Sequence, residues 1–423
     1  MADGSHRTPT LRSRLTASGG ALAPFSHPAF ATIWIATLVS QMGAMIQSVA
    51  AAWLMTELTR SHQLVAAVQA AVSLPILVLG VPAGAIADNF DRRRVMLVAQ
   101  WGLLLVSAAL TVLTLGGMIG PWGLLAFTLA VGAGGALNGP AWQASVRAQV
   151  GAKDLPQAVS LNAIAFNLAR SVGPALGGIL ILVAGIGAAF AINAASYVAL
   201  IWVLTRWRPE VPPPVRQPML PSIRAGVSFC IHSDPVRRVL LRGFCVGLGA
   251  SGFHSLLPVV VRDRLHGGEL SFGLVLGMFG LGSILAALFV SGIRRRLGTE
   301  TVTTFGVLAF VVAMPLLARV ETVGPALPVS FLAGIGWTAC MTTINVAMQV
   351  RSPDEFLGRC MSIYLSVVFG GMAAGAWLWG AIADWISLPA ALYGTSLWLL
   401  VALVGLRLLA PMPAPHEGRI SRL

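Results

Sequence analysis

The stretch GAIADNFDRR, residues 84–93, closes a long apolar segment with a glycine, a carboxylate and a basic run. Gly84 has no side chain, so a helix that carries it can approach a neighbouring helix closely. Asp88 would end that helix, where a carboxylate can meet an arginine or the N-terminus of another helix. The letters GAIAD recur at residues 380–384, where no arginine follows them. The first copy therefore predicts a charged turn between two apolar helices.

The composition around this stretch is that of a membrane protein. Of the 423 residues, 56% are hydrophobic and 10% are charged, with a mean hydropathy of +0.81. Soluble proteins carry about 25% charged residues, so this chain could not cover a water-exposed surface. Apolar runs of about 20 residues recur, and they are continuous rather than alternating, which favours spanning helices over a β-barrel.

We predict twelve spans and a division into two sets of six. The spans are 29–57, 63–87, 94–118, 121–147, 156–184, 187–206, 238–262, 270–292, 300–319, 324–349, 356–383 and 387–410. The expected organisation is a disordered tail (1–28), a six-helix bundle (29–206), a Pro-rich linker with an amphipathic stretch (207–237), a second bundle (238–410) and a tail (411–423). Prolines as dense as those of the linker stop a helix and resist packing.

The net charge of +13 is better explained by membrane orientation than by nucleic acid. If the N-terminus is cytosolic, 23 of the 28 basic residues fall on the cytosolic side and four on the other. This asymmetry follows the positive-inside rule and places both termini in the cytosol. No metal-ligand spacing, P-loop or reactive cluster appears, so we expect no enzyme, no metal and no cofactor; a membrane-embedded enzyme is a remote alternative.

The two halves also repeat. At an offset of 202 residues, Gly173 falls on Gly375 and Gly178 on Gly380, each in a glycine-rich span behind a polar turn. Two six-span halves related by an axis along the membrane normal are typical of secondary transporters. The predicted fold is therefore all-α, with twelve transmembrane helices in two pseudo-symmetric six-helix bundles.

The loop GAIADNFDRR resembles the signature loop of the major facilitator superfamily. Residues 138–197 further resemble its transmembrane secretion effector branch of drug and siderophore exporters. The resemblance implies that Asp88 meets the start of span eleven, near residues 358–362, and closes the cytosolic side. The implied gate comprises Gly84, Asp88, Asp91, Arg92 and Arg93. Asn89 and Asp91 depart from the family pattern, and the second GAIAD is expected only to pack and end its span.

Span five carries GPALGG, which resembles the core of the superfamily's antiporter motif. Its residues are Gly173, Pro174, Gly177 and Gly178. Proline bends a helix and glycines permit close packing, so this span could seal the protein while the halves rock. Ordinary glycine-mediated packing is the alternative.

Polar groups inside the spans are candidates for a substrate cavity, because an ionisable group there costs about 2.5–3.5 kcal/mol on insertion scales. Arg170 could bind an anionic group or tie span five to a neighbour. The resemblance implies that spans one, four, seven and ten line the cavity. The candidates are Gln41, Gln47, Asn138, Gln143, Arg170, His254, Asn345 and Gln349.

Proton coupling needs a titratable group that reaches both sides in turn. The candidates are Glu57, His254 and Asp263, with Glu57 foremost. We expect a monomeric bacterial inner-membrane exporter of small amphipathic molecules, drug-like or siderophore-like, that works by proton antiport with the lipid bilayer as its other partner. An uptake permease or an uncoupled facilitator is the alternative.

Overall fold

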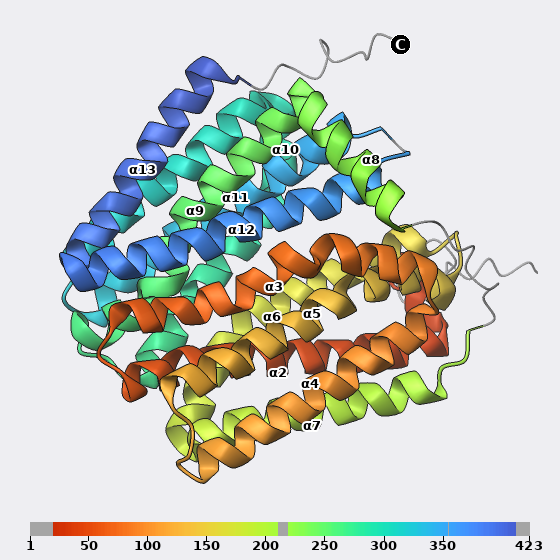
Figure 1. The fold of residues 1–423 in the computed structure, drawn as a ribbon, viewed down its shortest axis with the longest axis horizontal. Helices are drawn as coiled ribbons and strands as arrows, with labels where there is room; N and C mark the ends of the chain where they lie inside the picture. The colour runs from red at the N-terminus through yellow and green to blue at the C-terminus, as the bar shows by residue number, and fades with distance from the viewer. Residues whose placement is uncertain (1–19, 210–218, 354, 412–423) are drawn as a thin grey trace, which may run out of the picture.

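The computed structural model describes residues 20–209, 219–353 and 355–411, nearly all of them helical (Figure 1). The helices are η1 (Ala23–Ser26), α2 (Pro28–Leu58), α3 (His62–Asn89), α4 (Arg92–Leu115), α5 (Pro121–Val150), α6 (Leu155–Ala184), α7 (Ile186–Arg206), α8 (Met219–His232), α9 (Asp234–Asp263), α10 (Glu269–Arg319), α11 (Val323–Arg351), α12 (Leu357–Trp385) and α13 (Leu388–Leu409). Eleven of these are long and apolar enough to span a membrane.

The twelve predicted spans are confirmed, because α10 contains two of them. Gly298 interrupts this 51-residue helix with φ of +83°, a conformation that glycine adopts without strain. The observed ends lie within a few residues of the predicted ones. Hydrophobic length fixes them, since each apolar run must cover about 30 Å of hydrocarbon.

The segments outside the bundles are partly ordered. Residues 20–27 carry η1, whereas the sequence placed them in a disordered tail; residues 1–19 and 412–423 lie outside the described residues. The amphipathic stretch of the linker is α8, and it packs on the start of α12. Phe229 stacks on Phe356 with ring centroids 5.2 Å apart.

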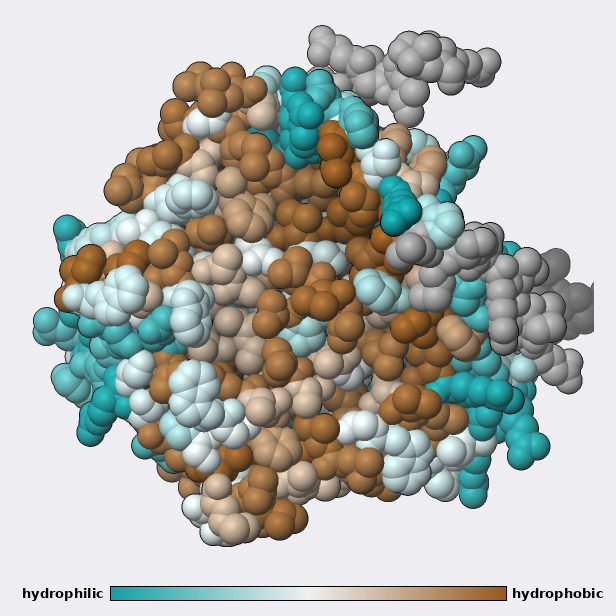
Figure 2. Space-filling view, viewed as in Figure 1, coloured by the Kyte–Doolittle hydropathy of each residue, from teal (hydrophilic) through white to brown (hydrophobic). Residues whose placement is uncertain are grey.

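The surface is that of a membrane-embedded bundle. Figure 2 shows a broad hydrophobic band across the middle of the molecule, with hydrophilic residues gathered toward its two sides. Large apolar side chains are open to the surroundings, among them Val183 (76% exposed) and Leu105 (65%). Lipid, not water, is the solvent that suits such a surface.

The two halves meet along two seams, α6 with the first part of α10 and α3 with α12. Small residues bring the backbones close at both. A Cβ on Gly178 would lie 2.7 Å from the Glu269 carbonyl oxygen, and a Cβ on Gly380 would lie 2.9 Å from the Gln63 Cα. Gly178 and Gly380 are the residues that the 202-residue offset pairs, so the two seams are related by the internal repeat.

The bundle has two ends, which we name by their loops. The linker end carries η1, α8 and the 90–91 turn. The far end carries the loops at residues 59–61, 264–268 and 386–387. Helices α3 and α12 run side by side and antiparallel between these ends (Figure 1), so each begins where the other finishes.

Candidate functional site

A cavity of about 1090 Å³ opens between the two halves at the linker end. The first half contributes α3 and α5 to its wall, the second half contributes α11 and α12, and the linker contributes α8. Three of the predicted cavity residues, Gln143, Asn345 and Gln349, line it. The Gln349 Nε2 donates to the Asn345 Oδ1 over 2.8 Å, which orients both amides along one wall.

The predicted gate residue Asp88 lies in the wall of this cavity, opposite the start of α12. Gly358 and Ser362 line the same cavity, and a Cβ on Gly84 would lie 3.3 Å from the Ser362 Oγ. Asp88 is exposed, and its carboxylate makes no hydrogen bond or ion pair with any residue the structure describes. Asp88 and the start of α12 therefore line the same cavity without making contact through the Asp88 carboxylate.

The remaining residues of the loop act within the first half. Arg92 donates to the Ala144 carbonyl over 3.0 Å, and Arg93 donates to the Leu204 and Thr205 carbonyls, each over 2.8 Å. Asp91 accepts from the Arg93 and Arg94 backbone N–H groups and so caps α4. These contacts anchor α4 to the ends of α5 and α7. In this conformation none of the three reaches the second half among the described residues.

A cation lies among aromatic rings near the middle of the bundle. The Arg170 guanidinium lies 5.5 Å from the Trp337 ring and 5.8 Å from the Phe279 ring. His254 contacts the same two rings edge-on, with centroids 5.2 and 5.0 Å away. The rings face the cation favourably, but no carboxylate pairs with Arg170 among the described residues. The cluster thus presents an uncompensated positive charge beside flat apolar surfaces.

Several polar atoms near this depth are buried without a hydrogen-bond partner among the described residues. They are the Gln41 Oε1, the Asn138 Oδ1, the Ser171 Oγ and the His254 Nε2. Buried polar groups are nearly always hydrogen-bonded, so such a group suggests a place for water or a ligand. Gln41, Asn138, Arg170 and His254 therefore stand as candidates for polar contacts deeper than the open cavity.

Gln47 is the exception among the predicted cavity residues, and its placement corrects that prediction. Gln47 lies on α2, and its side chain is 5% exposed and faces α4 and α7 inside the first half. Its Oε1 accepts from the Asn193 Nδ2 over 2.6 Å and from the Ser107 Oγ over 3.1 Å. The rotation of α2 decides this, because residues six apart on a helix, such as Gln41 and Gln47, point about 120° apart around its axis.

Replacing Gln47 by leucine should therefore lower stability without changing transport. The variant leaves Asn193 and Ser107 without their shared acceptor, and interhelical hydrogen bonds in membranes contribute roughly 0.6–2 kcal/mol. We expect a lower thermal midpoint in detergent and unchanged transport per folded molecule. A large loss of transport at an unchanged midpoint would place Gln47 in the substrate path.

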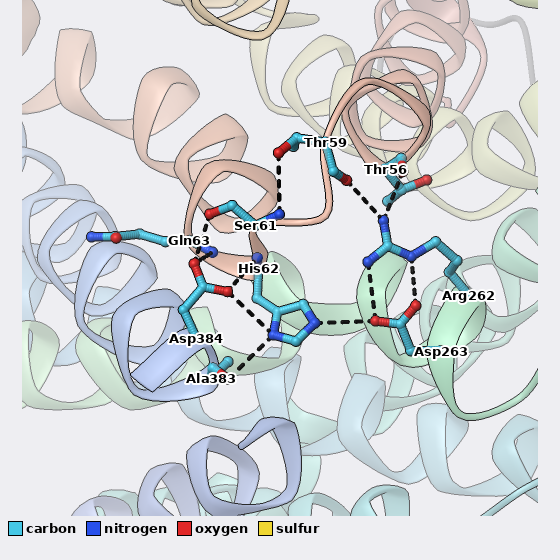
Figure 3. Close-up of polar contacts among 9 residues, drawn as sticks. All are labelled: Thr56, Thr59, Ser61, His62, Gln63, Arg262, Asp263, Ala383 and Asp384. Atoms are coloured by element: carbon cyan, nitrogen blue, oxygen red, sulfur yellow. Dashed lines mark hydrogen bonds and ion pairs between the residues drawn. The ribbon is translucent and has the colours of Figure 1, made fainter. Parts of the chain in front are cut away.

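The far end is closed by polar contacts that cross between the halves (Figure 3). Asp384 of α12 accepts from the Ser61 Oγ (2.6 Å), the His62 N–H (2.6 Å) and the Gln63 N–H (3.1 Å). The His62 ring reaches Asp263 at 3.1 Å and Asp384 at 3.4 Å. Arg262 donates to the Thr56 and Thr59 carbonyls. The two halves are therefore tied together at the far end, whereas a cavity separates them at the linker end.

The prediction for the second GAIAD copy is incomplete, because Gly380 packs against α3 and Asp384 lies near the end of α12 as expected, yet the Asp384 carboxylate also makes contacts that the sequence did not suggest. Asp384 does not merely end its helix; it is bound to the start of α3. Of the coupling candidates, Asp263 is held by Arg262 and His62, whereas Glu57 is exposed at the end of α2. Sequence reasoning missed His62, Arg262 and Asp384. The signal was the repeated GAIAD itself, on helices that run antiparallel in the predicted topology.

The comparisons with known proteins agree with this architecture. Residues 19–420 match the family of transmembrane secretion effectors. The chain belongs to this family. It is therefore a multi-pass membrane transporter of the major facilitator type and not an enzyme.

The relatives are exporters. The chain is 28% identical to the multidrug efflux pump Tap of Mycolicibacterium fortuitum over 87% of this chain and 92% of that protein. It is 26% identical to the enterobactin exporter EntS of Citrobacter koseri, over 84% and 86%. A POT family transporter shares the fold with a TM-score of 0.75 at 12% identity, covering 91% of this chain and 96% of that one. The nucleoside transporter NupG does so at 0.74 and 10%, covering 90% and 100%.

Proposed function

We propose that the protein exports small amphipathic molecules from the cytosol by alternating access. The observation that carries the proposal is the asymmetry of the two ends: a cavity of about 1090 Å³ lies between the halves at one end, and cross-half contacts close the other. Arginines gather at the linker end, so the positive-inside rule assigns it to the cytosol. The structure then corresponds to the state that loads a cytosolic substrate, in the inner membrane of a bacterium.

The charge of the central cluster favours substrates that combine an aromatic part with an anionic group. Arg170 offers donors for a carboxylate or a phenolate, and Trp337 and Phe279 offer faces for a flat ring. Such a combination of a cation and aromatic faces suits siderophore-like compounds, in line with the enterobactin exporters among the relatives. The cluster lies on α6, α10 and α11, so both halves would hold the ligand.

Proton antiport is our proposal for the driving force, with Glu57 as the foremost carrier. Its carboxylate is exposed at the far end and takes no part in the cross-half network drawn in Figure 3, so it is free to exchange a proton there. Asp263 has its hydrogen-bonding capacity committed to Arg262 and His62 in this state.

Transport into inverted membrane vesicles with an imposed pH gradient tests export and coupling together. We expect dyes, antibiotics or siderophores to accumulate when the vesicle interior is acidic, and Glu57→Gln to abolish the response to the gradient. Accumulation in right-side-out vesicles instead would establish the alternative of an uptake permease. Transport that ignores the gradient, with Glu57→Gln as active as the wild type, would establish an uncoupled facilitator.

A further inference from the structure

The two GAIAD stretches occupy equivalent places on two antiparallel neighbours. Helix α3 begins at the far end and finishes with Gly84 to Asp88 at the linker end; α12 begins at the linker end and finishes with Gly380 to Asp384 at the far end. Each glycine faces the first turns of the other helix. Gly84 lies against Ser362 of α12, and Gly380 lies against Gln63 and Ala66 of α3. A local two-fold relation therefore places each aspartate near the N-terminus of the opposite helix.

At the far end this contact is made. The first two N–H groups of α3, those of His62 and Gln63, donate to the Asp384 carboxylate, and the third, that of Leu64, donates to the Ser61 Oγ. The Ser61 hydroxyl in turn donates to Asp384. The N-terminus of α3 is thus capped jointly by the local Ser61 hydroxyl and by a carboxylate that belongs to the other half of the protein, and the helix dipole favours a negative charge at this end.

At the linker end the corresponding contact is open. Helix α12 begins after Phe356, and no side chain of a described residue caps its first N–H groups. Asp88 is exposed in the cavity that Gly358 and Ser362 also line. One aspartate is therefore docked and the other is undocked in the same structure.

We propose that Asp384 is the latch of the far end, working in alternation with Asp88 at the linker end. In the state seen here, the binding of Asp384 to the N-terminus of α3 holds the far end shut. Asp384 leaves that site when Asp88 caps α12 in the opposite state. The α6–α10 seam carries no such aspartate, since Leu182 stands where the 202-residue offset would place the equivalent of Asp384. This proposal rests on the alternating access proposed above.

His62 makes the far-end latch sensitive to pH. Its Nε2 lies 3.1 Å from the Asp263 carboxylate, and its Nδ1 lies 3.2 Å from the Ala383 carbonyl and 3.4 Å from Asp384. These partners only accept hydrogen bonds, and a neutral imidazole has one N–H, so satisfying both sides requires the imidazolium.

The charged groups around His62 set the direction of the effect. Asp384 faces it from α12 and Asp263 from α9, and Arg262 binds the same Asp263 carboxylate as His62 does. Only the imidazolium form of His62 carries a positive charge, so both ion pairs are lost when that proton leaves. The far end should therefore be held most firmly shut in mildly acidic surroundings and open more readily at alkaline pH.

Spin-label distance measurements on the full-length protein in lipid nanodiscs test the latch without relying on transport. In a background with the four cysteines replaced, one pair of labels at Met118 and Glu321 reports on the far end, and a second at Lys153 and Arg296 reports on the linker end. All four positions are at exposed loops or helix ends away from the latch. We expect the wild type to show a dominant short far-end distance at pH 5.5 and a second, longer one that grows by pH 8.

The variants separate the latch from the fold. Asp384→Asn should populate the long far-end distance at every pH. Asp384→Glu, which keeps the carboxylate, should restore part of the short-distance population that Asp384→Asn loses. His62→Gln should remove the pH dependence. Asp234→Asn, an exposed acid at the linker end, is the matched control and should behave as the wild type. Asp88→Asn should not lengthen the far-end distance but should deplete the state with a short linker-end distance.

The outcomes distinguish the two proposals. Two far-end distances in the wild type, with populations that neither Asp384→Asn nor His62→Gln changes, would overturn the latch and leave alternating access standing. A single far-end distance at all pH values and in the presence of transported compounds would overturn alternating access itself.

Discussion

Replacing Arg170 with glutamine should reduce export of an anionic aromatic substrate by about 100-fold or more. A hydrogen bond to a charged group contributes about 1.5–3 kcal/mol, and a guanidinium can form two to one carboxylate. At 1.4 kcal/mol for each factor of ten, the loss of both reaches at least two orders of magnitude. Uptake of a catecholate or salicylate probe into inverted vesicles measures the effect, and quenching of tryptophan fluorescence by the same probe measures binding.

Two comparisons show whether the charge binds substrate or supports the fold. Arg170→Lys keeps the charge but not the planar fork, so it should retain part of the transport. A cationic dye gains nothing from Arg170, and its export by Arg170→Gln should be unchanged or improved. Equal losses for the anion and the cation, with a lowered thermal midpoint, would assign Arg170 to helix packing instead.

Replacing Gly178 with valine should trap the protein with the two halves separated at the far end and cut turnover more than tenfold. A Cβ there would meet the Glu269 carbonyl oxygen at 2.7 Å and the Gly273 Cα at 3.1 Å, so α6 and α10 could not close on each other. Both obstacles are backbone atoms, which cannot rotate away. Overpacking of this kind costs about 1–3 kcal/mol, and here the cost falls on the state that needs the seam closed.

Gly135→Ala is the control for Gly178→Val, because a Cβ at Gly135 meets nothing within 4 Å. The control should transport as the wild type does. The far-end label pair should show the longer distance in Gly178→Val. A Gly178→Val protein that transports normally would mean that the α6–α10 seam is not closed tightly in any state of the cycle.

The sequence predicts the spans well and the side-chain partners poorly, for a physical reason. Span ends follow from hydrophobic length, which is a local property, and so α3 and α12 begin and end close to where they were expected. Gln47 was misplaced because its environment depends on how α2 is rotated against α4 and α7. Asp384 was misread because its partner lies 322 residues away along the chain, in the other half.

The cluster around Arg170 and His254 could be predicted in part from the sequence. The cost of burying an ionisable group marked Arg170 and His254 from the sequence alone. Their common neighbours, Phe279 and Trp337, lie on α10 and α11, and their place beside α6 depends on how the halves are docked. Of the loop GAIADNFDRR, the sequence predicted the position of Asp88 at a helix end. It did not reveal that Arg92 and Arg93 bind carbonyls within their own half in this conformation.

The antiparallel pairing of α3 and α12 bears on the energy balance of the transport cycle. A transporter must visit both of its end states in every turnover, so neither can lie many kcal/mol below the other. When one carboxylate leaves a helix N-terminus as its twin reaches another, a contact is exchanged for one of the same kind and nearly the same strength. The two states then stay close in free energy, and a modest preference of the substrate or of a proton for one of them is enough to turn the cycle in one direction.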